Sequence, residues 1–120
     1  MIGDDLTQVP VGELVSRYAE AAAEHVEASE QGDYRRANPQ HDVVAAIYRE
    51  LRRRGEAEAL LPLLAHADAA VRSWVGAHAL EFSPWEGERV LEELAAGAGV
   101  AGLNAQMTLE TWREGELRFP

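Results

Sequence analysis

The stretch LLPLLAHADAAVRSWVGAHAL, residues 60–80, decides the fold of this chain. It opens on a leucine-rich block, and Asp68 then stands where an N-cap carboxylate would accept backbone N–H bonds from a new helix. We therefore expect two short apolar helices with a hinge at residues 67–68, the second of which begins near Ala69.

The second of these helices is non-polar almost all round. On a helical wheel, one face gathers Val71, Trp74, Val75, His78, Ala79 and Phe82. The opposite side carries only Ser73, Gly76, Ala77 and Leu80. Such a helix must be enclosed by neighbours, so we expect it at the centre of the fold.

This stretch resembles one unit of a HEAT-type helical repeat in its leucine block, its turn at Asp68 and its run of small residues. A weaker second copy follows at an offset of 30 residues, with Val90, Leu91 and Leu94 matching Leu60, Leu61 and Leu64. Units of this kind stack because one alone cannot bury its apolar face. The expected fold is all-α, with five or six helices in HEAT-like antiparallel pairs that form one small right-handed array.

Length and composition indicate a single domain. The chain has 120 residues, of which 47% are hydrophobic, enough for one core. We expect a flexible acidic lead-in over residues 1–9 and the helical domain over residues 10–120. Because there is neither a signal-peptide pattern nor an apolar run of membrane-spanning length, we predict a soluble, cytoplasmic protein that binds no membrane.

The balance of acidic and basic residues indicates which classes of partner the protein can bind. The chain carries 21 acidic against 11 basic residues, a formal net charge of -10. Such a charge repels nucleic acid and attracts a basic protein. The chain has no cysteine, which excludes disulfides, zinc–thiolate sites and a cysteine nucleophile.

Helix signals divide the rest of the chain. A first helix is predicted from Pro10, in its first turn, to about Glu30. Its outer face carries an acidic stripe, made of Glu13, Glu20, Glu24 and Glu27. One turn of helix is expected at residues 34–37, and a second helix is then predicted to restart at Asn38, as N-cap, with Pro39 at the first position, and to run to about Arg54.

The C-terminal part continues in the same way. Ser83, Pro84 and Glu86 form a capping-box sequence that predicts a further helix. Its outer face would carry Trp85, Glu88, Arg89 and Glu92. Residues 97–102 are expected to form a loop before a last helix that Gly115 ends. Leu117 and Phe119 are expected to tuck against the core.

Motifs spread over most of the chain resemble a small bacterial HEAT-like family, the domain of unknown function number two thousand and nineteen. They are Glu13-Leu14-Val15 with Tyr18, Gly32-Asp33-Tyr34, Asn38, residues 46–51, residues 61–64, Val71-Arg72, and Met107-Thr108-Leu109 with Trp112 and Gly115. The resemblance implies an all-α HEAT-like fold and no settled activity. Pro39 departs from the helix-compatible residue expected there.

Motifs that carry chemistry are weak in this sequence. Residues 97–102 spell G-x-G-x-x-G, but a helix precedes them where a dinucleotide fold needs a strand. His78 with Glu81, and His66 with Asp68, lack a third metal ligand. Neither a nucleophile elbow nor a buried carboxylate pair is evident. We therefore expect no enzyme, no metal and no cofactor, and interpret His78 as a hydrogen-bonded core residue.

The sequence favours a non-catalytic module that binds a basic protein. More specifically, it suggests an immunity-type protein that neutralises a cognate toxic effector. The predicted partner-binding residues are Glu13, Glu20, Glu24, Glu27, Trp85, Glu88 and Glu92. The alternatives are a small-molecule or metal sensor, or minor enzyme, with a pocket near His78 and His25, and a structural homo-oligomer that buries Trp85.

Overall fold

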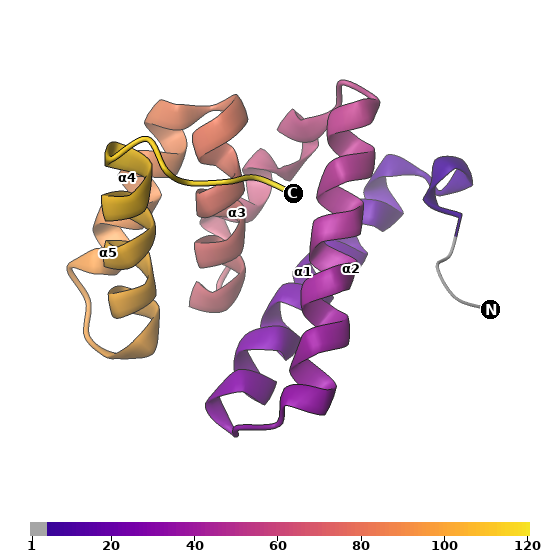
Figure 1. The fold of residues 1–120 in the computed structure, drawn as a ribbon. Coiled ribbons are helices and arrows are strands. Elements are labelled where there is room, and N and C mark those ends of the chain that lie inside the picture. The colour runs from indigo at the N-terminus through magenta and orange to yellow at the C-terminus, as the bar shows by residue number, and fades with distance from the viewer. Residues whose placement is uncertain (1–4) are drawn as a thin grey trace. The chain divides into compact units, whose positions relative to one another are not determined.

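The chain folds into α-helices and 3-10 helices. The computed structural model describes residues 5–120, and these contain five α-helices, two 3-10 helices and no strand. The prediction of an all-α fold is confirmed. The chain forms two compact units (Figure 1): one runs to Ala59 and includes Pro120, and the other spans Leu60–Phe119.

The first unit is a helical hairpin of α1, Val11–Glu30, and α2, Tyr34–Arg53 (Figure 1). Pro10 is the N-cap of α1, one position before the predicted place. The turn contains Gly32 with φ of +72°, a left-handed conformation that glycine adopts at little cost. Asp33 then caps α2 by accepting a hydrogen bond from the backbone N–H of Arg36 at 3.2 Å.

The predicted restart at Asn38 and Pro39 is wrong, because α2 already begins at Tyr34 and continues through both residues. Proline removes one backbone hydrogen bond from a helix and crowds the preceding turn. Here it falls in the second turn of α2 on an exposed side, close to the end where unpaired N–H groups are normal. The stronger start signal is Asp33, whose carboxylate provides the cap that Asn38 was expected to supply.

Large side chains fill the space between α1 and α2. Leu14 and Tyr18 of α1 are fully buried. One stripe of α2 is buried as well and consists of Val44, Ile47, Tyr48 and Leu51. Burial raises the pKa of the Tyr18 hydroxyl well above its usual value, so this ring stays neutral. The hairpin core therefore rests on aromatic and branched aliphatic packing.

An ion cluster at the end of α2 holds the chain N-terminal to α1. Residues 1–4 of the predicted lead-in lie outside the described part of the chain, and Asp5 caps the 3-10 helix η1, Leu6–Gln8. Arg54 donates one hydrogen bond to the Leu6 carbonyl at 2.6 Å and another to Glu50 at 2.7 Å. Hydrogen bonds from Arg53 and Arg54 lower the pKa of Glu50 to about 2.

The central stretch begins with the 3-10 helix η2, Ala57–Ala65, where the sequence predicted a short apolar helix. Helix α3, Ala69–Phe82, then starts at the predicted residue. The Asp68 carboxylate accepts from the N–H of Ala70 at 2.9 Å, which confirms Asp68 as the N-cap. Burial extends beyond the predicted face to Ala70, Gly76 and Leu80, as enclosure on several sides requires.

Helix α4, Pro84–Ala95, follows α3 after one residue. Ser83 is both the C-cap of α3 and the N-cap of α4, so the predicted helix start is confirmed. The predicted capping box is wrong in its bonding, because the Ser83 hydroxyl donates to the Glu86 carboxylate at 3.3 Å and makes no side-chain cap bond. Pro84 occupies the first helical position, where its missing N–H costs nothing.

Close backbone approach joins α3 to α4. A Cβ atom added to Gly87 would lie 2.7 Å from the Gly76 carbonyl oxygen and 2.9 Å from the Leu80 nitrogen. These distances are shorter than real Cβ contacts, and both neighbours are backbone atoms. Glycine at position 87 is therefore required for the observed packing of the two helices.

Helix α5, Gly99–Arg113, starts earlier than predicted, so residues 99–102 of the predicted loop are helical. Gly102 is buried, and an added Cβ atom would meet the carbonyl oxygen of Gly97. Gly99 has φ of +86° at the turn. The G-x-G-x-x-G spacing thus serves a tight turn and close packing between α4 and α5, which lie side by side (Figure 1).

The second unit has its own apolar cluster of Leu80, Leu91, Ala105 and Leu109. Five partly buried side chains pack against it: Leu94, Ala95, Trp112, Leu117 and Phe119. The packing of Leu117 and Phe119 confirms the predicted docking of the C-terminal segment. Nowhere in residues 5–120 is a helix both long and apolar enough to cross a membrane.

Candidate partner-binding site

The four acidic residues predicted on the first helix all lie on α1. Two of them form ion pairs, Glu13 with Arg17 of α1 and Glu24 with Arg36 of α2. Glu20 and Glu27 are exposed. Helix α1 thus presents a partly neutralised acidic face, and none of its large apolar side chains is exposed.

The outward face of α4 combines charge with an aromatic ring. Trp85 stands at the second position of α4, and its side chain is 73% exposed. The Arg89 guanidinium lies one turn later, 6.0 Å from the centre of the indole ring, a cation–π distance. Pro84 and the Ser83 cap fix the start of the helix and hence the direction in which Trp85 projects.

Glu88 and Glu92 project from α4 toward α5, where one arginine bridges them. Arg113 donates from Nη2 to Glu88 at 2.9 Å and to Glu92 at 3.1 Å. Chiefly through its bond to Glu88, this arrangement raises the pKa of Arg113 above the usual value for arginine. The carboxylate spacing therefore fits a guanidinium group, a relation that the sequence did not indicate because 21 residues separate Glu92 from Arg113.

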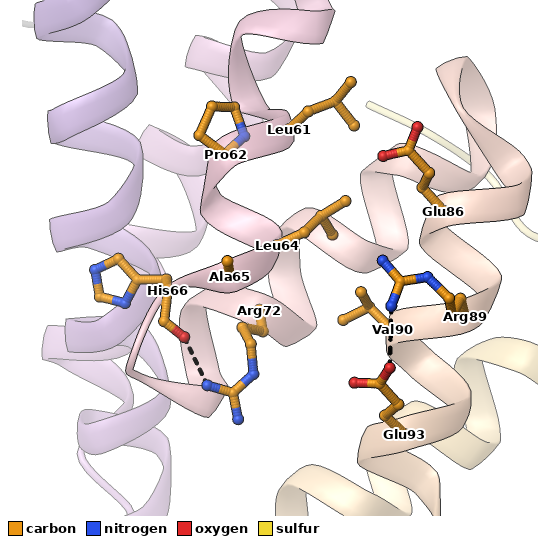
Figure 2. Close-up of a pocket in the computed structure, with 10 residues that line it drawn as sticks. All are labelled: Leu61, Pro62, Leu64, Ala65, His66, Arg72, Glu86, Arg89, Val90 and Glu93. Atoms are coloured by element: carbon orange, nitrogen blue, oxygen red, sulfur yellow. Dashed lines mark hydrogen bonds and ion pairs between the residues drawn. The ribbon is translucent and has the colours of Figure 1, made fainter.

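A groove on the other side of α4 was also missed by the sequence analysis. It has a volume of about 540 Å³, and Figure 2 shows its wall on α4 facing the end of η2 and the start of α3. Leu61, Leu64 and Val90 supply its apolar surface. Charged residues of both signs surround them: Arg72, Glu86, Arg89 and Glu93. The groove joins residues distant in sequence, and no local pattern marks it.

Hydrogen bonds hold the polar rim of this groove in place. Arg72 donates from Nη1 to the backbone carbonyls of His66 at 2.6 Å and Ala67 at 3.0 Å, and Figure 2 shows the first of these bonds. His66 Nδ1 accepts from the backbone N–H of Asp68 at 3.0 Å. Arg89 pairs with Glu93 at 3.1 Å. The rim is preorganised around the turn between η2 and α3.

A smaller hollow of about 340 Å³ lies between α4 and α5. Its lining includes Glu92 and Arg113, together with Ala95, Ala96, Gln106, Leu109 and Glu110. Gln106 donates to the carbonyl of Ala95 at 3.0 Å across this hollow. The acidic pair of α4 thus borders a concave surface.

His25 and His78, the two histidines of the alternative pocket, belong to different units. His78 is 4% exposed on α3, where its ring lies 5.7 Å from that of Trp74. His25 belongs to the other unit, where its ring lies 5.8 Å from His41, and burial followed by the His41 charge lowers its pKa. Neither hollow described above is lined by His25 or His78. Among residues 5–120, no three histidine or acidic side chains are grouped to hold a metal ion.

The seven predicted residues form two sets, one in each unit. Trp85, Glu88 and Glu92 share the outward side of α4, which joins an exposed aromatic ring to a pair of carboxylates. The set on α1 supplies charge without an exposed aromatic anchor. The α4 set, bordered by the groove and by the smaller hollow, is therefore the candidate site.

Fold and surface together define an all-helical protein in which an exposed tryptophan stands beside paired carboxylates. The chain belongs to the family described as Domain of unknown function (DUF2019), whose model matches residues 12–112. It is similar to the protein RPA1889 from Rhodopseudomonas palustris CGA009, known from a crystal structure, with 26% identity and a TM-score of 0.90. That match covers 98% of this chain and 100% of the other. No curated protein matches the sequence.

Proposed function

We propose that this protein is a non-catalytic binding module that engages a basic protein through the outward face of α4. The observation that carries the proposal is the 73% exposure of Trp85. Tryptophan provides a large rigid contact area, and it is enriched among the residues that dominate binding energy in protein interfaces. An exposed indole at a fixed helix start is therefore a natural anchor for a partner.

The acidic pair beside this anchor supports a basic partner. A single guanidinium already bridges Glu88 and Glu92 at 2.9 and 3.1 Å, so their spacing suits an arginine side chain. The net charge of -10 adds long-range attraction, which raises the rate of encounter with a cation-rich surface. In this proposal a partner arginine contacts the same carboxylates from the solvent side.

The biological role that we propose is neutralisation of a cognate toxic effector. An acidic helical surface with a rigid aromatic anchor is suited to covering the basic active site of a nucleic-acid-cleaving or similar domain. The proposal needs no catalytic group in this chain. We also propose that the helix pairs are HEAT-like, because arrays of that kind offer extended binding surfaces.

The test is capture of partners from native lysate at low and moderate salt, followed by titration calorimetry with each purified basic partner and with effectors encoded beside the gene. Trp85→Ala is expected to weaken binding by about 2 kcal/mol, roughly 30-fold in Kd, as for an interface hot spot. Moderate salt is expected to weaken binding of the wild type, because it screens the charges. Co-expression is expected to relieve the effector's toxicity.

A matched pair of variants separates the α4 surface from bulk charge. Glu88→Gln with Glu92→Gln, and Glu20→Gln with Glu27→Gln, each remove two negative charges, the first from α4 and the second from α1. Only the α4 pair is expected to lower affinity strongly. Equal effects of the two pairs, or unchanged binding by Trp85→Ala, would show that α4 is not the contact. Absence of both binding and rescue would reject the effector role.

A further inference from the structure

The outer face of α5 carries an exposed apolar stripe that none of the contacts described above uses. Val100 is 50% exposed, Leu103 56% and Met107 55%. Their spacing places them on one side of the helix, away from the buried Ala105 and Leu109. Three half-exposed apolar side chains in one row are unusual for a helix whose solvent side would otherwise be polar.

The stripe lies in the longest uncharged part of the chain. Residues 94–109 contain no Asp, Glu, Lys or Arg, although charged residues make up 27% of the sequence. This run of sixteen residues covers the end of α4, the turn and most of α5. The stripe is therefore an uncharged apolar patch on a strongly acidic protein, and its three side chains offer a basic partner no charge to bind.

We propose that the outer face of α5 is the contact between two copies of this chain. Two molecules that each carry a charge of -10 repel each other over most of their surfaces. An uncharged apolar face is where that repulsion is smallest and where burial of apolar side chains is favourable. A two-fold symmetric pair places the same patch on both sides, so Leu103 of one copy meets the stripe of the other.

An antiparallel arrangement of the two α5 helices also gives charge complementarity. Ala98, the N-cap of α5, makes no side-chain cap bond. If Val100 lies opposite Met107 of the second copy, Glu110 of that copy lies level with Gly97, beside this helix start. A carboxylate is favoured there because backbone N–H groups and the helix dipole point at it. Glu110 is the one acidic residue within Gly99–Arg113.

The small size of the stripe makes the association weak, and salt affects it in a characteristic direction. A contact of this size lies below the range of stable interfaces, so the pair forms at high concentration. Added salt strengthens it by screening the repulsion between the two copies. Salt weakens the binding of a basic partner at α4, so the two contacts can be told apart. The inference stands independently of the proposed function.

Sedimentation equilibrium of the full chain, from about 10 µM to about 1 mM, tests the proposal over the range of weak complexes. The mass is expected to rise from 13.2 kDa toward twice that value, at lower concentration in high salt. Leu103→Asn, a neutral change at an exposed position, is expected to raise the dimer Kd at least tenfold. Glu110→Gln is expected to raise it about threefold, within the range of a helix-dipole contact.

Two control variants fix the location of the contact. Val43→Asn changes a 39% exposed apolar residue on α2, and Trp85→Ala changes the anchor on α4. Both are expected to leave the dimer Kd unchanged, with helical circular dichroism verifying the fold of every variant. A monomer at all concentrations, a Leu103→Asn protein that dimerises like wild type, or a dimer lost through Trp85→Ala would each overturn the proposal.

Discussion

The two units hold their helices together by different means. In the α1–α2 hairpin, the buried surface is made by bulky side chains such as Leu14, Tyr18 and Tyr48. In the second unit, α4 approaches α3 through Gly87, and α5 approaches the end of α4 through Gly102. Packing of bulky side chains is destabilised when a side chain is shortened, because a cavity is left. A close backbone contact is destabilised when a side chain is added, because there is no room for it.

This difference matters for the candidate site, which lies on α4. Because backbone atoms of α3 face Gly87 directly, no side-chain rearrangement can make room for a larger residue. The position of α4, and with it that of Trp85, is therefore set by glycine packing. The hairpin has side chains at its contact surface, and these adjust more easily than backbone does.

The largest expected effect is the loss of a bulky residue from the hairpin. Leu14→Ala removes a fully buried side chain and leaves a cavity, so it is expected to lower the free energy of unfolding by about 3 kcal/mol. Urea denaturation followed by circular dichroism measures this. A loss below about 1 kcal/mol would show that the hairpin closes around the gap and does not depend on bulky packing.

Gly87→Ala is the complementary change in the second unit. The added methyl group would lie 2.7 Å from the Gly76 carbonyl oxygen, so α3 and α4 must move apart. We expect a net loss of about 2 kcal/mol, even though alanine favours helix formation more than glycine does. The same denaturation experiment measures it. Stability equal to or above wild type would mean that the close approach is not required.

Acid is expected to weaken the first unit through Glu50. Its pKa is lowered from the usual 4.5 to about 2 in the folded chain, so the unfolded chain binds the proton more readily. This contribution to stability is complete above pH 4.5 and is lost progressively as pH falls toward 2. Between these pH values, the free energy of unfolding is expected to fall less steeply with decreasing pH for Glu50→Gln than for wild type, as measured by urea unfolding curves. Parallel curves for wild type and variant would contradict the assignment.

The smallest effect is expected at a glycine that has no packing role. An added Cβ atom at Gly12 of α1 would meet nothing within 4 Å. Gly12→Ala is therefore expected to raise stability by about 0.5 kcal/mol, because alanine loses less backbone entropy in a helix. In thermal denaturation, a gain of stability for Gly12→Ala together with a loss for Gly87→Ala would sharpen the contrast between the units. Stability changes of the same sign in both variants would remove that contrast.

Most helices could be predicted from the sequence because their ends are encoded locally. Asp68, Ser83 and Gly115 mark ends that depend on a few neighbouring residues, and the structure has them at those positions. Where two local signals compete, prediction failed. Asp33 and Asn38 each offer a cap, and the sequence alone did not reveal that Asp33 begins a helix able to continue through Pro39.

Contacts between distant residues could not be predicted in the same way. The bond from Arg113 to Glu88, and the groove that joins Leu61 to Val90, depend on how helices pack. The glycines of residues 97–102 resemble a loop in sequence, whereas Gly102 is buried inside α5. The outward position of Trp85 could be predicted from helical periodicity, whereas its 73% exposure could not, since a tryptophan at a helix start can pack or project.

The aromatic residues divide between the two units by type. The three tyrosines, Tyr18, Tyr34 and Tyr48, all lie in the first unit, and the three tryptophans, Trp74, Trp85 and Trp112, all lie in the second. The chain therefore carries a separate natural chromophore for each unit. Fluorescence excited selectively at tryptophan, beside the tyrosine absorbance change, will show in one sample whether the two units melt together or one before the other.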